Sequence, residues 1–322
     1  MRKLADARIE LIDALVAEAD LGGVTASLLE KDDHLTAALH AVFGLEFEHA
    51  RLVFCGGTSL SKAYGLIERM SEDADIKVIM SQDSSTWPAN KLRRYLGDEV
   101  RNRVNQTLES IGLVEDVSLR RSLNGNRYLH SQWSYERVYN GIAALRPNLQ
   151  IELTVRSPIQ TIEHALVGTL ADRFAGRMGP NLEVPVVAVS ETLAEKVLSF
   201  LRRFALHRNN QMQFKWDSAL VRHIYDVHCI YTLTSEVLGN AELVFAPLTA
   251  VDKEEYGYQD AEFTKNPSAV LRNALQLAKD DPQLQSDYEG VLIPLVYGKD
   301  KCPYQTAWTS FESVAKQLLR TL

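Results

Sequence analysis

A glycine turn followed by a pair of acids is the part of this sequence that has the residue types for chemistry. Gly56-Gly57-Thr58 follows an apolar stretch typical of a short buried strand and precedes a helix expected at residues 59–67, whose N-terminal amides would face the turn and bind phosphate. Asp73 and Asp75 stand at the start of a strand expected at residues 74–80. Two residues apart, they project from one face and could hold Mg²⁺ against a triphosphate. The combination predicts metal-assisted phosphoryl transfer.

Each part of this pattern also has an ordinary structural explanation. A double glycine before a helix is most often a tight turn, and two acids in alternation are most often a solvated strand edge. Here a strand, a glycine turn, a helix and an acid-bearing strand follow one another in the order that the chemistry requires. This order favours a nucleotidyltransferase site.

The same residues resemble the AbiEii and MenT group of nucleotidyltransferase-like toxins, a branch of the DNA polymerase β-like superfamily. The resemblance rests on Gly56-Gly57-Thr58-x-Leu60-x-Lys62 and on Arg69-x-Ser71-Glu72-Asp73-x-Asp75. It extends to further segments between about residues 29 and 231: Leu29-Glu30-Lys31-Asp32, Gln150-Ile151-Glu152-Leu153, Leu193-Ala194-Glu195-Lys196 with Arg203, and Arg222-His223-Ile224-Tyr225-Asp226. His223 stands where the family usually has an acid, so no role is assigned to it.

The resemblance implies a role for each of these residues. The metal ligands would be Asp73, Asp75 and Glu152, holding two Mg²⁺ ions or Mn²⁺ in their place. The catalytic set would add Lys196 and Asp226. The nucleotide-binding residues would be Gly56, Gly57, Thr58, Lys62, Arg69, Ser71, Lys196 and Arg203. Alternation with an apolar face at Leu149, Ile151, Leu153 and Val155 independently puts Glu152 on the opposite, polar face of its strand.

For several of these residues the sequence leaves two interpretations open. Lys62 either contacts the phosphates or lies over the surface of its helix. Lys196 and Arg203, seven residues apart on one helix face, either neutralise triphosphate charge or are an ordinary surface lysine and helix-end arginine. Asp226 either positions Lys196 or a substrate hydroxyl, or it pairs with Arg222 one turn earlier.

The function implied by the resemblance is transfer of a nucleotidyl group from a nucleoside triphosphate to an acceptor hydroxyl. The expected acceptor is an RNA 3′ end, with tRNA as a candidate, and the protein would be a translation-inhibiting toxin of a toxin–antitoxin or phage-defence system with a cognate antitoxin. Two alternatives stay open: nucleotidylation of a protein or small molecule, and a non-catalytic nucleotide-binding defence protein. Retention of all three acids favours catalysis.

Composition is that of an ordinary globular protein. With 322 residues, 46% hydrophobic and 24% charged, the chain is long enough for two domains with their own cores. The sequence shows no apolar run long enough for a membrane span and no apolar segment behind Met1-Arg2-Lys3, so a cytoplasmic location is expected. Three scattered cysteines fit reduced thiols rather than a disulfide framework.

The formal net charge of −7 argues against a generally basic nucleic-acid surface, although a local one is compatible with it. Basic residues gather in three places, each of which is more often a solvated face: Lys91, Arg93, Arg94, Arg101 and Arg103; Arg120, Arg121 and Arg127; and Arg202, Arg203, His207 and Arg208. The expectation that the protein binds nucleic acid therefore rests mainly on the resemblance.

The expected fold class is α+β, a nucleotidyltransferase-fold mixed sheet with flanking helices followed by a mainly helical C-terminal domain. Residues 1–158 would form the core with helices at 4–19 and 28–43, and residues 159–322 the helical domain that completes the cleft. Further strands are expected at 114–121, 128–135 and 149–156, the first two joined by an Asn-Gly hairpin. Helices are expected at 88–110, 161–174, 190–204, 217–233, 268–278 and 307–322, with 247–267 as an exposed loop.

Overall fold

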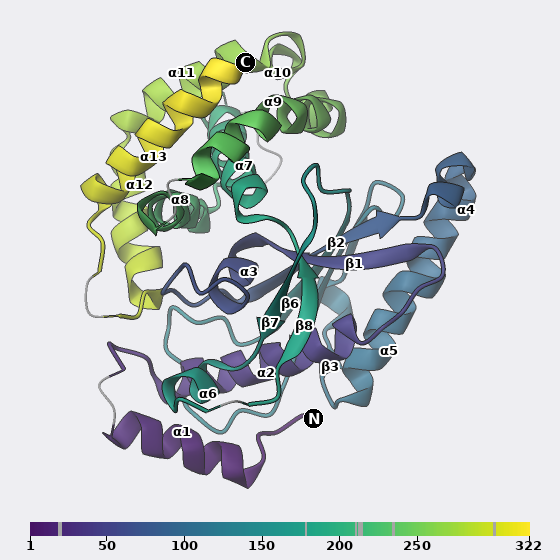
Figure 1. The fold of residues 1–322 in the computed structure, drawn as a ribbon, viewed down its shortest axis with the longest axis vertical. Coiled ribbons are helices and arrows are strands. Elements are labelled where there is room, and N and C mark those ends of the chain that lie inside the picture. Colours follow the sequence, from purple (N-terminus) through teal and green to yellow (C-terminus); the bar gives the residue numbers. More distant parts are fainter. Residues whose placement is uncertain (19–20, 178, 210, 212–214, 234–235, 299–300) are drawn as a thin grey trace. The chain divides into compact units, whose positions relative to one another are not determined.

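The structure of the protein is a computed structural model, which describes residues 1–18, 21–177, 179–209, 211, 215–233, 236–298 and 301–322. The chain divides into two compact units (Figure 1). The first unit comprises Met1–Ser157, Ile162–Val187 and a short piece beginning at Tyr297. The second comprises Pro158–Thr161, Ala188–Val296 and the C-terminal residues up to Leu322.

The first unit is organised around a mixed sheet, as expected for the α+β class. Its strands follow the order β3-β5-β6-β2-β1-β8-β7, with β4 paired to β5. The central strand β2 is antiparallel to β1 and parallel to β6. The strands span Ala50–Cys55 (β1), Asp73–Met80 (β2), Val114–Glu115 (β3), Arg121–Leu123 (β4), Tyr128–Ser134 (β5), Leu149–Val155 (β6), Glu163–Val167 (β7) and Leu182–Val186 (β8).

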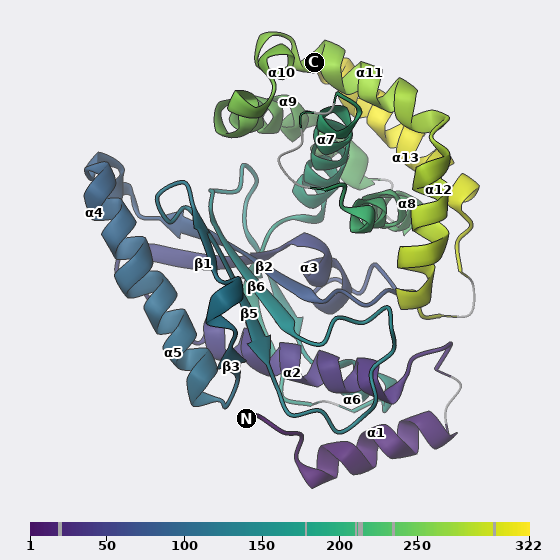
Figure 2. The ribbon, with the colours of Figure 1, turned by 180° about the vertical axis from the view of Figure 1, so that it is seen from behind.

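Helices cover the apolar face of this sheet. The main core joins Leu35 and Leu39 of α2, Val100 and Val104 of the long helical rod, and inward residues of β2, β5 and β6. The rod runs through α4, a π-helical stretch (Tyr95–Arg101) and α5 (Figure 2). The α-helices of this unit are Asp6–Glu18 (α1), Ala26–Phe43 (α2), Gly56–Lys62 (α3), Ala89–Arg94 (α4), Asn102–Ser110 (α5) and Leu170–Phe174 (α6). Residue 19, the last of the first predicted helix, lies outside the described residues.

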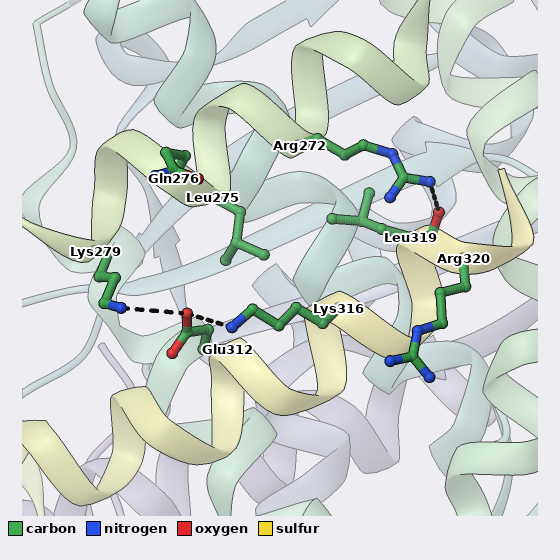
Figure 3. Close-up of a pocket in the computed structure, with 8 residues that line it drawn as sticks. All are labelled: Arg272, Leu275, Gln276, Lys279, Glu312, Lys316, Leu319 and Arg320. Carbon is green, nitrogen blue, oxygen red and sulfur yellow. Dashed lines mark hydrogen bonds and ion pairs between the residues drawn. The ribbon is translucent and has the colours of Figure 1, made fainter.

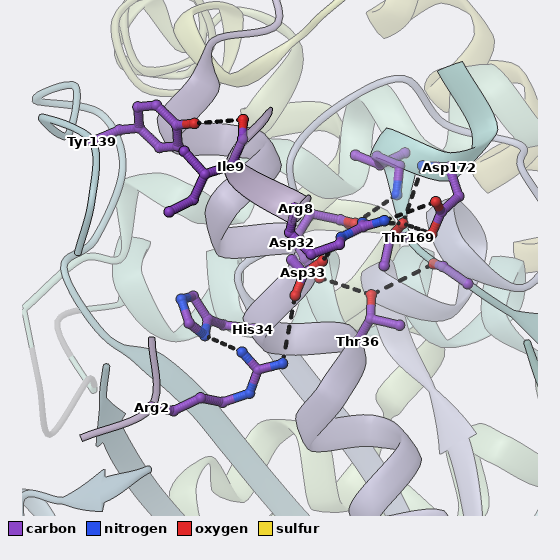
Figure 4. A network of polar contacts seen from close by, with 12 residues as sticks. Arg2, Arg8, Ile9, Asp32, Asp33, His34, Thr36, Tyr139, Thr169 and Asp172 are labelled. Carbon is purple, nitrogen blue, oxygen red and sulfur yellow. Dashed lines mark hydrogen bonds and ion pairs between the residues drawn. The ribbon is translucent and has the colours of Figure 1, made fainter. Parts of the chain in front are cut away.

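The N-terminal helix is attached by polar contacts. Arg8 of α1 donates to Asp33 of α2 at 2.7 Å and to Asp172 of α6 at 2.7 Å (Figure 4). Arg2 donates to the ring of His34, Nη1 to Nδ1, at 2.8 Å, and that ring stacks on Tyr135 with the centroids 4.1 Å apart. A fully buried imidazole that accepts from an arginine must be neutral, so this contact depends on pH.

Acid is expected to destabilise the protein through His34. Burial, reinforced by the charge of Arg2, lowers the pKa of His34 from 6.5 to about 3. Below pH 6.5, His34 therefore becomes protonated in the unfolded chain but stays neutral in the folded protein. The free energy of unfolding falls as the pH drops from about 6.5 towards 3. Between pH 7 and pH 5 the free energy of unfolding should lose about 2 kcal/mol more in wild type than in His34→Phe. Urea unfolding at the two pH values measures this difference, and equal losses would contradict it.

The second unit is helical and has α7 at its centre. Aromatic rings of α7 and α13 fill its core, where Phe200 meets Phe311 edge to face with the centroids 4.9 Å apart. Its helices are Val189–Arg208 (α7), Arg222–Leu233 (α8), Glu236–Tyr256 (α9), Ala261–Lys265 (α10), Pro267–Lys279 (α11), Pro282–Asp287 (α12) and Tyr304–Leu318 (α13). Within the described residues, every helix is too short or too polar to cross a membrane.

The first stretch of the first unit ends at Ser157, beside the boundary predicted at residue 158. Residues 163–186 return to the first unit, where β8 pairs in parallel with β1 and β7 pairs with β8. The helix predicted at 161–174 is wrong: β7 occupies its first half and α6 its end. The strands form because they can extend an existing sheet edge, a long-range pairing that local periodicity does not show.

The loop predicted at 247–267 is also wrong. Helix α9 runs straight through Pro247. Its buried residues Ala241, Val244, Phe245 and Leu248 pack on one side of the helix, mainly against α7. This packing outweighs the backbone hydrogen bond that a proline removes, an example of tertiary structure overriding propensity.

Candidate active site

Strand pairing places the three predicted metal-binding acids on one face of the sheet. In the parallel register of β2 and β6, Asp75 lies opposite Glu152 and Asp73 lies opposite Gln150. Residues opposite one another in paired strands share a face. The alternate residues Ile76 and Leu153 are buried in the core, so the acids point away from it. The alternation predicted for Glu152 is confirmed.

Gly56 allows the carboxylate of Asp75 to lie against the backbone. Gly56 has φ +75°, a conformation that favours glycine. A Cβ atom there would stand 2.0 Å from Oδ2 of Asp75. Helix α3 begins at Gly56 and ends at Lys62, so the glycines form its first turn instead of preceding a helix at 59–67. The site therefore requires glycine for two reasons, backbone conformation and space.

Substituting alanine for Gly56 is expected to reduce nucleotidyl transfer by about 100-fold, because the methyl group displaces Asp75 and a misplacement of about 1 Å can cost that much. Stability should fall by about 1–2 kcal/mol from the left-handed backbone alone. Gly65→Ala is the matched control: it has φ +65° and its Cβ would meet no atom closer than 3.9 Å. Steady-state kinetics and thermal unfolding of both variants test this. Equal activity losses would show that strain, and not the carboxylate, is responsible.

Close contacts join the start of α3 to the start of β2. The residues that make them are Gly57, Thr58, Arg69 and Ser71. A Cβ at Gly57 would be 2.6 Å from an Nη atom of Arg69 and 3.2 Å from Oγ of Ser71. The hydroxyl of Thr58 lies 2.8 Å from Oγ of Ser71 and donates to the backbone carbonyl of Asp73. These contacts fix the strand that carries the acids. The Thr58 hydroxyl, expected to bind phosphate, is used for this purpose instead.

Lys62 has a structural role, which corrects its predicted contact with phosphate. Its buried Nζ lies 2.6 Å from Oδ1 of Asp32 and donates to Oγ1 of Thr36 at 2.6 Å and to the carbonyl of Gly168 at 3.2 Å. An ammonium group has three N–H donors, and all three have acceptors here. Burial lowers the pKa of Lys62 while Asp32 opposes that shift. The aspartate of the Glu-Lys-Asp segment thus anchors α3 to α2.

Arg146 is a residue of the site that sequence reasoning missed. Its Nη1 donates to Oδ1 of Asp73 at 2.9 Å and to the side-chain oxygen of Gln150 at 2.7 Å. The arginine lies in a loop with no recognisable motif, and its guanidinium is partly exposed, with 38% of the side chain accessible. A cation that reaches solvent beside the acids can hold phosphate oxygens.

A buried ion pair holds the backbone of Arg146. Nζ of Lys31 lies 2.8 Å from Oε1 of Glu72, and both side chains are 0% exposed. Lys31 also donates to the carbonyl of Arg146 at 2.7 Å, and the Arg146 amide donates to Oε1 of Glu72 at 2.6 Å. The lysine of the Glu-Lys-Asp segment therefore positions an arginine far away in the sequence.

Tyr128 and His130 extend the polar face across β5. His130 lies opposite Glu152 in the antiparallel register of β5 and β6. Burial raises the pKa of Tyr128, and the nearby carboxylate of Glu152, to which its hydroxyl is hydrogen-bonded, raises it further; Asp75 contributes as well. Tyr128 thus stays protonated and can donate. Neither residue was predicted, although the alternation of the strand at 128–135 could have placed both on this face.

The acids have the donor type that a metal shared with a substrate would require. In the described part of the chain, no group of three or more His, Cys, Asp or Glu side chains is arranged to hold a metal ion by itself. Mg²⁺ usually takes one or two carboxylates and completes its octahedron with water and substrate phosphates. Asp73 and Asp75, from one strand face, are the donor type for this arrangement, and Gly56 leaves room beside Asp75.

In the second unit, Lys196 of α7 is paired with Asp226 of α8. Nζ and Oδ2 are 2.7 Å apart, and the side chains are 8% and 0% exposed. His223 lies 2.9 Å from the carbonyl of Lys196 and donates to it through Nδ1. The ion pair of Lys196 with Asp226 is the contact expected if Asp226 positions Lys196. The histidine in place of the family's usual acid joins α8 to α7.

Arg203 lies seven residues after Lys196, on the same face of α7. Its side chain is more exposed than that of Lys196. Its Nη2 lies 2.9 Å from Oδ2 of Asp217, and the two side chains are 32% and 44% exposed. A partly exposed pair of this kind is weak and can exchange partners. The structure thus keeps Lys196 fixed and leaves Arg203 accessible to an anion.

Comparisons with known proteins identify similar sequences and folds. A sequence family described as "Nucleotidyl transferase AbiEii toxin, Type IV TA system" matches residues 37–316, which include all the predicted site residues. Among solved structures, MenT4, a nucleotidyltransferase toxin from Mycobacterium tuberculosis H37Rv, is similar with a TM-score of 0.54 and 18% identity over 98% of this chain and 90% of that chain. At this identity the likeness shows the fold. A search of curated proteins found no match.

Proposed function

Because this chain belongs to the AbiEii nucleotidyl transferase toxin family of type IV toxin–antitoxin systems, and is therefore a nucleotidyltransferase, we propose that it moves a nucleotidyl group from a nucleoside triphosphate to the 3′ hydroxyl of an RNA, with tRNA as the first candidate. The observation that carries the proposal is the placement of Asp73, Asp75 and Glu152 on one sheet face beside Gly56. A cognate antitoxin is the partner that the family implies.

The acids supply the chemistry of the transfer. Asp73, Asp75 and Glu152 would hold Mg²⁺, which when bound stabilises negative charge developing on the transferred group. The acceptor oxygen forms a bond to the α-phosphorus while the bond to pyrophosphate breaks. Glu152 would take the proton of the acceptor hydroxyl, and Tyr128, hydrogen-bonded to it, would orient the carboxylate. Arg146, beside Asp73, holds phosphate oxygens.

The second unit contributes charge in this proposal. Lys196, held by Asp226, would neutralise triphosphate charge, and Arg203 would assist after leaving Asp217. The support for including these residues is the family resemblance and the ordered state of Lys196. Amides in the first turn of α3, at Gly56, Gly57 and Thr58, would bind phosphate oxygens.

Two of the predicted basic clusters come together in the first unit, which supports RNA as the acceptor. The amide side chain of Asn126, in the hairpin between β4 and β5, donates to the carbonyl of Arg93 in α4 at 2.8 Å. This contact brings the helix with exposed Arg93 and Arg94 beside the hairpin with exposed Arg121 and Arg127. Arg120, of the same cluster, is paired with Glu115. Arg121 lies opposite His130, which in turn lies opposite Glu152. Arg121 of the hairpin thus shares the sheet face that carries the acids.

One arginine of the third cluster, Arg202, has a structural role. Arg202 is buried and lies 3.1 Å from Oδ2 of Asp252. Its guanidinium also stacks over the ring of Tyr256 at 4.0 Å. Arg202 therefore joins α7 to α9 and is not available to RNA.

Reversing the charge of Arg93 and Arg94 together is expected to weaken RNA binding. Loss of two phosphate contacts should lower the slope of log K against log salt by about 1.4 and the affinity at 0.1 M salt by about 10- to 30-fold. Affinity for the nucleoside triphosphate should stay nearly constant, because other groups hold it. Fluorescence anisotropy with labelled RNA measures both. The control is Lys253→Glu/Lys265→Glu, the same change of charge at exposed residues of α9 and α10; an equal loss there would show a net-charge effect.

A single incubation tests the proposed function. Purified protein, total RNA, each labelled nucleoside triphosphate in turn and Mg²⁺ are combined, and the products are separated on denaturing gels. Label on RNA that disappears when Mg²⁺ is chelated supports the proposal. Label on protein, or on a small molecule, would replace RNA by that acceptor. Nucleotide binding without transfer would indicate a non-catalytic defence protein.

A further inference from the structure

A basic groove lies between α11 and α13, in the second unit. Its volume is about 420 Å³, and its lining comprises Arg272, Leu275, Gln276, Lys279, Glu312, Lys316, Leu319 and Arg320. Four cations and one carboxylate give it a net charge of about +3 in a chain whose formal charge is −7. The positive charge of the groove does not come from the basic clusters noted in the sequence. The residues that line the groove belong to two helices far apart in the chain.

The two ends of the groove differ in how much of their charge is neutralised. At one end, Glu312 lies between Lys316 at 2.7 Å and Lys279 at 4.0 Å (Figure 3). At the other end, Arg272 donates to the backbone carbonyl of Leu319 and to Oγ of Ser268. No hydrogen bond or ion pair joins Arg320 to another residue in the part of the chain that the structure describes. The arginine end is therefore open to an anion.

The Arg272 guanidinium is held in place yet keeps donors unused. Two of its nitrogens, Nε and Nη2, have acceptors, the Nη2 bond being the one drawn to Leu319 (Figure 3), while Nη1 has no acceptor among the described residues. A fixed guanidinium with free N–H groups loses little conformational entropy on binding phosphate and offers the fork geometry that phosphate oxygens accept.

The spacing of the cations suits a chain of phosphates. Arg272 and Lys279 are two turns apart on α11, about 10 Å along the helix axis. Lys316 and Arg320 are four residues apart on the facing segment. Leu275 and Leu319 lie between them and give the groove an apolar floor. Charges distributed along both walls of an open groove match a polyanion better than a single phosphate, which would favour a compact cluster.

We infer that this groove binds the phosphodiester backbone of the acceptor RNA, at a second point in addition to the basic surface of the first unit. The inference rests on the proposed function in taking RNA as the acceptor. Two separate contacts would bind one RNA more tightly than either alone, because the second contact forms at high effective concentration. The alternative is that the groove only joins two helices through salt bridges and binds no ligand, and the experiment tests the inference against this alternative.

The test compares Lys279→Glu/Arg320→Glu with wild type and with Lys253→Glu/Lys265→Glu. All four lysines and arginines are exposed, so melting temperatures should stay close to that of wild type. Binding of labelled RNA is measured by anisotropy across a salt series, without nucleotide. The groove variant should lose about 10- to 30-fold in affinity at 0.1 M salt and about 1.4 in slope, while the control loses much less. In transfer assays the KM for RNA should rise and kcat should stay within about twofold.

Each contrary result identifies what has failed. If wild type binds RNA and the groove variant binds it equally well, the inference is wrong and the proposed function stands. Equal losses in the groove variant and the control also overturn it, since net charge would then be responsible. If wild type binds no RNA, both the inference and RNA as acceptor are wrong. If the groove variant loses RNA affinity while wild type labels protein, the groove binds RNA, but RNA as the acceptor is wrong, and with it the proposed function.

Discussion

Asp75→Asn should reduce nucleotidyl transfer by about 10³-fold, equivalent to about 4 kcal/mol of transition-state stabilisation. The change removes a negative charge and almost no volume from a side chain that lies against Gly56. An amide cannot replace the charge with which the carboxylate holds a hard cation. Because the new side chain has the same shape, the strand pairing of β2 with β1 and β6 should persist. Initial rates at saturating nucleotide, with circular dichroism to check the fold, measure the effect.

Asp83→Asn is the matched control for this prediction. Asp83 lies in the short helical turn Gln82–Thr86 that follows β2, and it is exposed. The chemical change is identical and the site lies only eight residues further along the chain. Activity of the Asp83 variant should stay within about twofold of wild type, as is usual for a surface change. Undiminished turnover in Asp75→Asn would remove the acids from the catalytic assignment.

The sequence predicted the central part of the site because that part depends on local alternation. Asp73 and Asp75 are two residues apart in a strand, and Glu152 alternates with Ile151 and Leu153, so period-two spacing alone puts each acid on the polar face of its own strand. The hairpin at Asn124-Gly125 was predicted for a similar reason, since both residues adopt the positive φ angles that tight turns demand.

The roles of charged side chains could not be predicted in this way. Lys62 follows the glycine turn by one helical turn, as a phosphate ligand would, but its partner Asp32 comes from a helix thirty residues earlier. Arg146 reaches Asp73 only because Lys31 and Glu72 fix its loop. Such contacts join distant segments, and periodicity describes only what each segment does alone. The Glu-Lys-Asp segment carried a usable signal, because charges on the buried face of a helix require partners.

Burial explains why that segment is informative. Lys31 and Asp32 are almost fully buried in α2, where an unpaired charge would cost several kcal/mol. Each therefore needs an opposite charge, and each partner lies within or beside the site: Glu72 precedes Asp73, and Lys62 ends α3. Helix α2 thus sets the position of both the acid-bearing strand and the glycine turn, although none of its residues belongs to the predicted catalytic set.

Replacing Lys31 with methionine is expected to lower the free energy of unfolding by about 3–5 kcal/mol. Methionine fills much of the same volume but removes the ammonium group that lies 2.8 Å from the buried Glu72 carboxylate and donates to the Arg146 carbonyl. The remaining amide of Arg146, 2.6 Å from Oε1 of Glu72, cannot offset the lost charge. Urea unfolding followed by fluorescence gives the change in free energy at pH 7.

Lys3→Met provides the comparison, since Lys3 also faces a glutamate. Its Nζ lies 3.9 Å from Oε1 of Glu136, and both side chains are 53% exposed, so water screens the pair and its loss should cost no more than about 1 kcal/mol. The double variant Lys31→Met/Glu72→Leu should recover part of the stability lost in Lys31→Met, because it also removes the buried carboxylate from which Lys31 was taken. Similar losses for Lys3→Met and Lys31→Met, or no recovery in the double variant, would mean that the buried pair does not hold the Arg146 loop in place through its charge.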